Sequence, residues 1–149
     1  MADNTELTQL RTDSVAIQIK VASLEFEKMA SKALAPFGLT PSQYKVLKLV
    51  LSEPDNSIRQ VDIEHLFSMT NPTVTGIIHN LEKNGLVKRV PNPNDARSKV
   101  IVPTRKALDL KERLLQVGRE IEEEFTQNLS EAERKRLLAL IEKLLKNNA

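Results

Sequence analysis

A predicted helix over residues 72–84 gathers polar side chains on one face, where they can hydrogen-bond to a partner outside the chain. On a 3.6-residue wheel the other face is apolar and is expected to point into a core: Val74, Ile77, Ile78 and Leu81. The polar face, which begins beside Asn71, has hydroxyl, imidazole, amide and ammonium groups and one glycine: Thr73, Thr75, Gly76, His79, Asn80 and Lys83. Such groups contact phosphates and base edges in a DNA major groove. A plain solvated helix face has the same composition, so the neighbouring elements must decide between the two.

Basic residues are concentrated from this helix onward. The whole chain has 22 Lys and Arg against 20 Asp and Glu, a net charge of +2. Residues 79–106 contain seven basic residues and two acidic ones, which gives 7 − 2 = +5 for this segment. The basic residues are Lys83, Lys88, Arg89, Arg97, Lys99, Arg105 and Lys106. A local basic stripe in a nearly neutral protein indicates a polyanionic partner, while an uneven distribution of solvated surface charge is the alternative.

Capping signals predict the helices that position these residues, near 7–35, 41–52, 58–66, 72–84, 105–127 and 131–146. The S/T-x-x-E/Q pattern of a capping box occurs at residues 40–43, 57–60 and 130–133. Asn71 followed by Pro72 is typical of a helix start, with Asn71 as the N-cap. Gly85 suits the left-handed residue that ends a helix, and Thr104 is expected to cap the long helix after it.

The segment 86–103 has the composition of a β-hairpin. The runs 86–90 and 99–102 are rich in β-branched residues and predict two short strands. Proline, asparagine and aspartate fill residues 91–98, which predicts a long hairpin tip. A two-stranded hairpin is marginal by itself, so it must pack on the helices before it.

The order of these elements favours a helix-turn-helix followed by a basic wing. Helix 58–66 ends a few residues before helix 72–84 begins, as in helix-turn-helix proteins. Arg97 near the wing tip suits a narrow, negative minor groove, and Asp95 can hold its guanidinium group. The alternative for this pair is an exposed ion pair worth less than about 1 kcal/mol.

The first helix carries apolar stripes on two nearly opposite sides, so it must be sandwiched between partners. One stripe is Leu10, Ile17, Val21 and Leu24, and the other is Val15, Ile19, Ala22, Phe26, Ala30 and Ala33. The last two helices are similarly rich in leucine and isoleucine. We therefore expect a homodimer in which the N- and C-terminal helices of two subunits interdigitate, with packing of these helices within one chain as the alternative.

Enzymatic and membrane functions are not expected. The chain has no cysteine and two histidines, which excludes thiolate chemistry and disfavours a histidine-rich metal site. None of the common phosphate-loop, nucleophile or metalloprotease motifs occurs, so we expect no catalysis, no cofactor and no metal. No apolar run approaches the roughly 20 residues that span a bilayer, and the polar first residues do not fit a signal peptide. A cytoplasmic protein is expected.

From Leu39 onward the sequence resembles the MarR (multiple antibiotic resistance regulator) family of transcription factors. The matching segments are LTPSQYKVL (39–47), NPTVTG (71–76), LEKNGLVKR (81–89), DARSK (95–99), TRKA (104–107) and LSEAE (129–133). Ala107 stands where the family usually has glycine, and this departure concerns only the start of the helix. Each segment is weak alone, but the ordered set at the correct spacing is specific.

The resemblance implies a mainly α fold with a small β-hairpin wing, and a single MarR-type domain over residues 1–149. Its dimerisation helices would be 7–35 and 105–149, around a winged helix-turn-helix lobe at 39–104. It implies a homodimer on a pseudo-palindromic double-stranded DNA operator, a sequence-specific regulator that usually represses. The candidate DNA-binding residues are Asn71, Thr73, Thr75, Gly76, His79, Asn80, Lys83, Lys88, Arg89, Asp95, Arg97 and Lys99. A winged-helix protein-interaction module without DNA binding is the alternative function, and it would need an apolar outer face on helix 72–84.

The resemblance also implies a small aromatic or phenolic effector that binds between the dimerisation helices and the lobe. The candidate ligand-binding residues are Phe26, Met29, Tyr44 and Phe67. Each of the four is also an ordinary core residue by its type.

Overall fold

The computed structural model of the chain describes residues 4–53 and 57–146 and combines helices with one β-hairpin. In chain order the elements are α1 (Asn4–Thr12), α2 (Val15–Leu34), the 3₁₀ turn η1 (Ala35–Phe37), α3 (Pro41–Ser52), α4 (Gln60–Phe67), α5 (Asn71–Lys83), β1 (Val87–Asn92), β2 (Asp95–Pro103), α6 (Arg105–Phe125) and α7 (Glu131–Lys146). The two strands pair antiparallel. The expected fold class, mainly α with a small β-hairpin wing, is confirmed.

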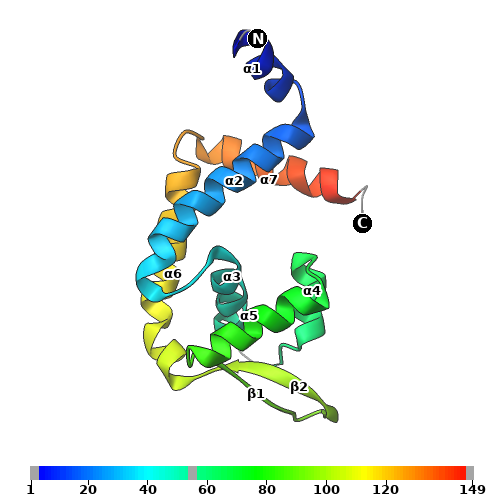
Figure 1. Ribbon diagram of the computed structural model, residues 1–149, viewed down its shortest axis with the longest axis vertical. Helices are drawn as coiled ribbons and strands as arrows, with labels where there is room; N and C mark the ends of the chain where they lie inside the picture. The colour runs from blue at the N-terminus through cyan, green and yellow to red at the C-terminus, as the bar shows by residue number, and fades with distance from the viewer. Residues whose placement is uncertain (1–3, 54–56, 147–149) are drawn as a thin grey trace.

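The elements form a lobe held at one side by two long helices (Figure 1). Helices α2 and α6 contact each other, and α3 contacts both of them. The lobe consists of α3, α4, α5 and the hairpin, which lies along its lower edge in Figure 1. Helix α7 leaves the upper end of α6, and α1 projects beyond the start of α2. The long helices therefore set where the lobe is presented.

The apolar core of the lobe lies beneath α5 and continues onto α2 and α6. The predicted inward face of α5 is confirmed, because Val74, Ile77, Ile78 and Leu81 are at most 7% exposed. The other elements add the buried residues Val46, Leu47 and Val50 from α3, Ile63 from α4 and Ile101 from β2. Burying each such side chain contributes about 1.5–3 kcal/mol, so the orientation of α5 is fixed by packing.

Three predicted helix starts are confirmed by their capping bonds. The Thr40 hydroxyl accepts from the backbone N–H of Gln43, and the Gln43 side chain accepts from the backbone N–H of Thr40, both at 3.2 Å. Ser130 and Glu133 form the same reciprocal pair, at 2.9 and 3.1 Å. Thr104 accepts from the N–H three residues later at 3.3 Å. A cap of this kind contributes about 0.5–2 kcal/mol.

The predicted continuous helix 7–35 is wrong. The chain leaves the helix at Asp13, and Ser14 starts a new helix by accepting from the backbone N–H of Ile17 at 3.2 Å. Apolar periodicity alone continues through this point, but a serine in extended conformation is a strong N-cap. A 3₁₀ turn then ends α2 before Gly38, which has a φ of +68°.

Two further helix starts also differ from prediction. The capping box at residues 57–60 is wrong, because α4 begins at Gln60 and Asp62 accepts from the backbone N–H of Arg59 at 2.9 Å. Ile58 instead extends alongside β2, where its carbonyl accepts from Ile101 at 2.7 Å. For α5 the N-cap is Thr70, and Asn71 is the first helical residue.

The long hairpin tip predicted at 91–98 is also wrong. The strands continue to Asn92 and Asp95, which pair across the hairpin, and an irregularity in register lies between Pro91 and Asn92. Proline is tolerated in an edge strand or a bulge, so the proline-rich segment stays in the ladder. The wing is therefore longer and its turn tighter than the composition indicates.

Candidate nucleic-acid interface

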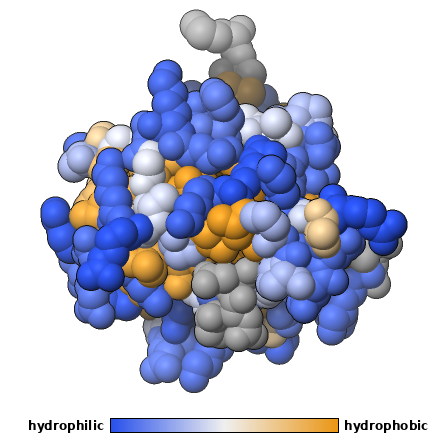
Figure 2. Space-filling model, turned by 90° about the horizontal axis from the view of Figure 1, so that it is seen from below, coloured by the Kyte–Doolittle hydropathy of each residue, from blue (hydrophilic) through white to orange (hydrophobic). Residues whose placement is uncertain are grey.

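The outer face of α5 is open to a partner along its whole length. All the residues predicted on this face are exposed: Asn71, Thr73, Thr75, Gly76, His79, Asn80 and Lys83. The neighbouring positions on the helix are buried, so the packing of α5 itself turns the polar groups outward. Seen from below the view of Figure 1, the molecule presents mainly hydrophilic side chains with smaller apolar patches between them (Figure 2).

Hydrogen bonds from neighbouring residues orient the threonine hydroxyls of α5. The Gln60 side chain donates to the Thr75 hydroxyl at 2.8 Å, and Thr70 donates to the Thr73 hydroxyl at 2.9 Å. Each accepting hydroxyl keeps its own proton to donate. A phosphate oxygen or a base acceptor is a suitable recipient for that proton. Sequence analysis missed Gln60, whose contact lies 15 residues along the chain.

The position of Asn71 suggested that its side chain caps α5, but the side chain makes a different contact. Its amide donates to the Glu64 carboxylate at 3.3 Å and so ties the start of α5 to α4. Asn71 remains exposed beside the other polar residues on the outer face of α5.

The wing presents Arg97 to solvent. The Asp95 carboxylate accepts from the backbone N–H of Arg97 at 3.0 Å and from its guanidinium Nε at 3.4 Å. The Arg97 side chain is nevertheless 94% exposed. A bond from Asn92 to the Ser98 hydroxyl, at 3.0 Å, orders the same hairpin end. The predicted juxtaposition of Asp95 and Arg97 is thus present, and the charge of Arg97 remains accessible.

The other basic residues of the wing are placed differently from one another. Lys88 and Lys99 are exposed. Arg89 donates to Glu82 of α5 at 3.1 Å, and this ion pair links β1 to that helix. Arg89 therefore pairs with a residue of α5, whereas Arg97 pairs with Asp95 inside the wing.

Arg59 is a further basic residue at this surface. Its guanidinium forms a two-pronged bond to Asp62, with Nη2 to Oδ1 at 2.8 Å and Nε to Oδ2 at 3.1 Å. Hydrogen bonding to Asp62 raises the pKa of Arg59, and hydrogen bonding to Arg59 lowers the pKa of Asp62. Helix α4 contacts strand β2 of the wing, and the Asp95 charge adds a smaller contribution that also raises the pKa of Arg59. The count of basic residues over 79–106 did not include Arg59. The aspartate three residues after it, Asp62, was a signal in the sequence for an ion pair at this position.

A cavity of about 640 Å³ lies between α2, α3 and α6. Phe26 and Tyr44 line this cavity, whereas Met29 and Phe67 are not among its lining residues. Phe67 instead lies under the Lys45 side chain, and the Lys45 ammonium nitrogen is 5.0 Å from the centroid of the Phe67 ring. Charged residues at the cavity are Lys45, Lys48, Arg119, Arg134, Glu27, Glu122 and Glu123.

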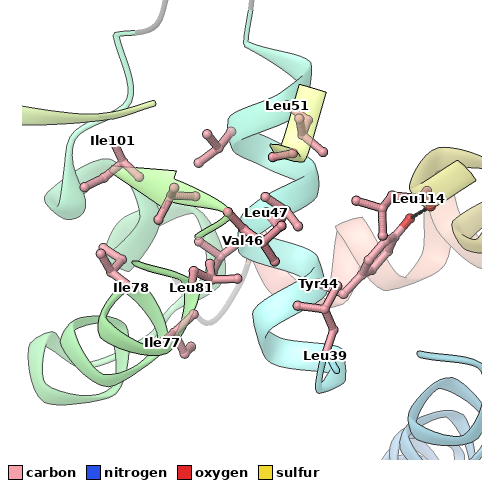
Figure 3. Close-up of a cluster of buried hydrophobic side chains, with 14 of the residues drawn as sticks. Leu39, Tyr44, Val46, Leu47, Leu51, Ile77, Ile78, Leu81, Ile101 and Leu114 are labelled. Atoms are coloured by element: carbon pink, nitrogen blue, oxygen red, sulfur yellow. Dashed lines mark hydrogen bonds between the residues drawn. The ribbon is translucent and has the colours of Figure 1, made fainter. Parts of the chain in front are cut away.

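Tyr44 is the buried polar residue of this cavity. Its hydroxyl donates to the backbone carbonyl of Leu114 at 2.7 Å, and Figure 3 shows the ring reaching from α3 toward α6. Burial raises the pKa of Tyr44, so the hydroxyl keeps its proton for this bond.

Two negative findings concern the described ranges 4–53 and 57–146. None of their helices has the length and apolar character needed to cross a membrane. They also contain no group of three or more histidine, aspartate or glutamate residues arranged to hold a metal ion.

A short helix, a tight turn, a helix with a polar outer face and a basic hairpin define a winged helix-turn-helix protein. The sequence model described as MarR family matches residues 39–99. The chain is 28% identical over 128 residues to the multiple antibiotic resistance protein MarR of Escherichia coli K12, covering 85% of this chain and 88% of that protein. It is 30% identical over 112 residues to the HTH-type transcriptional regulator SarZ of Staphylococcus saprophyticus, covering 75% of each.

The fold agrees with these matches. The crystal structure of the S. aureus MepR–DNA complex superposes with a TM-score of 0.81 at 27% identity, covering 90% of this chain and 98% of that one. The chain belongs to the MarR family of transcriptional regulators.

Proposed function

We propose that the chain acts in the cytoplasm as a homodimer that binds a pseudo-palindromic operator and represses transcription until a small aromatic or phenolic molecule releases it. The observation that carries the proposal is the exposed polar face of α5 beside the exposed Arg97 of the wing. The two belong to one lobe, since α5 contacts β1, and β1 pairs with the strand β2 that carries Arg97. The resemblance to a protein solved on DNA supports the same orientation.

On the operator, α5 enters the major groove and the wing enters the adjoining minor groove. The amide of Asn80 can pair with two atoms of an adenine, which makes it the base-reading residue of the set. Lys83 and the two threonines of the outer face contact phosphates, which position the helix without reading sequence. Arg97 is suited to the negative potential of a narrow minor groove.

Exposed apolar surface supports the dimer. On α2 the side chains of Val15, Ile17, Ile19 and Leu24 are exposed. No residue of α7 is buried, and the exposed set on this helix is Leu137, Leu138, Leu140, Ile141, Leu144 and Leu145. Apolar surface of this extent marks a protein interface, and a second copy of the chain offers the same helices in return.

The cavity between α2, α3 and α6 supports the effector. Its volume of about 640 Å³ lies within the range of about 300–1,000 Å³ typical of small-molecule sites. The rings of Phe26 and Tyr44 offer apolar contacts, and Lys45 and Arg119 offer charge to a phenolate or carboxylate. An occupant there touches both the lobe and the long helices.

The test is selection of bound sequences from a random pool of duplex DNA by the full-length protein, followed by a salt titration on the selected sequence and on unrelated duplex. We expect an inverted repeat, and affinity that falls steeply with salt as counterions are displaced. A protein-interaction module would enrich no sequence and show no salt dependence.

Release of the protein by aromatic carboxylates and phenols is then measured on the selected duplex. Arg119→Ala is the variant expected to need more of these compounds for release.

A further inference from the structure

The chain contains four glycines, and the structure describes all of them. Gly38 and Gly85 have left-handed backbones, with φ of +68° and +71°, which other residues rarely adopt. Gly118 lies against the side chain of Tyr44, and a Cβ there would be 3.0 Å from Cζ of that ring. A requirement inside the chain therefore accounts for these three glycines.

Gly76 meets no such requirement. It lies inside the 13-residue helix α5, its φ is not positive, and a Cβ added to it would meet nothing within 4 Å beyond its own stretch of helix. A glycine inside a helix is less stable than alanine, because it has more conformational freedom to lose on folding. The reason for a glycine at this position therefore lies outside the chain, on the side to which Gly76 is exposed.

Gly76 lies on the line of α5 that the proposed function places in the major groove. Residues four apart lie one above the other on a helix, so Pro72, Gly76 and Asn80 share one line. All three residues are exposed. The missing side chain at Gly76 thus leaves a gap between the proline ring and the amide that is assigned to a base.

This gap suits an apolar group better than a polar one. The backbone N–H of a residue inside a helix is already bonded within the helix, so Gly76 offers a partner only hydrogens on carbon. A base donor or acceptor placed there would lose its hydrogen bond to water and gain none. In the major groove, thymine is the base that presents an apolar group, its C5-methyl.

We infer that Gly76 receives the C5-methyl group of a thymine in each half-site and makes the protein specific for thymine at that position. Gly76 and Asn80 are about 6 Å apart along α5, at 1.5 Å per residue. The rise along one DNA strand is about 3.4 Å per base. This thymine therefore lies about two base-pair steps from the adenine assigned to Asn80.

The inference rests on the proposed function, because its readout is binding to the operator that the selection experiment identifies. Each thymine of that operator is replaced in turn by deoxyuridine, which removes the methyl group and keeps the base pair. Full-length wild type and Gly76→Ala are titrated on the whole series at one salt concentration. Ser31→Ala, at an exposed position of α2, is the matched control. Thermal melting confirms that each variant is folded.

For the wild type we expect one thymine in each half-site at which deoxyuridine lowers the affinity by about fourfold, the effect of one buried methyl group. Gly76→Ala should melt at a higher temperature than the wild type. Its affinity for the parental operator should be lower by about tenfold or more, because the alanine methyl occupies the space of the thymine methyl.

The decisive comparison is made at that one thymine. Deoxyuridine should raise the affinity of Gly76→Ala there, whereas it lowers the affinity of the wild type and of Ser31→Ala. Such a change of sign is not expected from altered stability or from a general loss of DNA binding, because neither depends on one methyl group of the DNA.

Several results overturn the inference. One is a wild-type affinity that is the same with deoxyuridine at every thymine. Another is a Gly76→Ala variant that binds the parental operator as well as the wild type does, or that loses the same affinity with thymine and with deoxyuridine. Failure of Gly76→Ala to fold overturns it too, since the position would then not be open. Absence of any operator binding by the wild type is a different result, because it contradicts the proposed function itself.

Discussion

At the scale of single residues, the proposed interface on α5 divides into groups expected to read sequence and groups expected to bind any duplex. Asn80→Ala should relax base preference at one operator position by about 1–3 kcal/mol, because a two-atom contact with a base is lost. Lys83→Ala should weaken all duplexes alike and reduce the salt slope by about one unit per phosphate contact. Both variants are assayed against a library of half-site sequences, with the exposed Lys32→Ala on α2 as the matched control. Identical profiles for the Asn80 and Lys83 variants would contradict the assignment.

Arg97 tests the wing independently of α5. Because its side chain is almost fully exposed, removing it should leave thermal stability unchanged while strongly reducing operator affinity. Asp95→Ala should weaken binding less, since it frees the guanidinium group without removing its charge. Both effects should be larger on operators with A·T-rich flanks, where the minor groove narrows. Equal affinity of the wild type and Arg97→Ala on such an operator, at physiological salt, would leave Arg97 as an ordinary surface residue.

At the scale of elements, Asp62 stabilises the start of α4 in a pH-dependent way. Its pKa is lowered in the folded chain, chiefly by the bond from Arg59. A lowered pKa gives stability that is present above the unfolded value of about 3.9 and is lost as the pH falls through the folded value. The side chain is 38% exposed, so the contribution is below about 1 kcal/mol.

Asp62→Asn should therefore lower the urea midpoint at pH 7 and have a diminishing effect as the pH falls below about 4. The double variant with Arg59→Ala isolates the pair by a thermodynamic cycle. If Asp62→Asn lowers the urea midpoint by the same amount at pH 3 and at pH 7, the carboxylate charge plays no part in this cap.

Local signals in the sequence predicted most elements, and the errors occur where two signals compete. The caps at Thr40, Thr104 and Ser130 were predictable because each uses residues within one helical turn. The break at Ser14 was missed because the apolar periodicity continues across it. Ile58 was placed in a helix because its pairing with Ile101 is a tertiary contact that no local pattern contains.

The candidate site divides in the same way. The exposed face of α5 was predictable, since the opposite face is apolar at helical spacing. The bond from Gln60 to Thr75 and the two-pronged pair of Arg59 with Asp62 join side chains whose relative position depends on folding. Phe26 and Tyr44 border the cavity, whereas Phe67 does not. Residue type alone cannot distinguish an aromatic ring at a cavity from one in a core.

At the scale of the whole molecule, the exposed helices α2 and α7 predict that assembly and stability are linked. Full-length protein should have a mass of about 34 kDa in light scattering, twice the 16.8 kDa of one chain. Leu138→Glu combined with Leu145→Glu should abolish the dimer and lower the melting temperature. Both side chains are more than half exposed in the single chain. A monomeric protein would tolerate these substitutions, and Arg136→Glu on the same helix is the matched control. Unchanged mass and melting temperature of the double variant would contradict the dimer.

The placement of α2, α6 and α7 outside the lobe has a genetic consequence. In the proposed homodimer, a chain with a damaged lobe and intact long helices would still pair with normal chains, and the mixed dimer would have only one half able to hold an operator. When equal amounts of both chains mix at random, only a quarter of the dimers are fully intact. We therefore expect alleles altered at Asn80 or Arg97 to be dominant over the normal gene in a merodiploid cell. Alleles truncated before α7 should be recessive, because their products cannot join the dimer. A reporter under the selected operator measures the difference between the two classes.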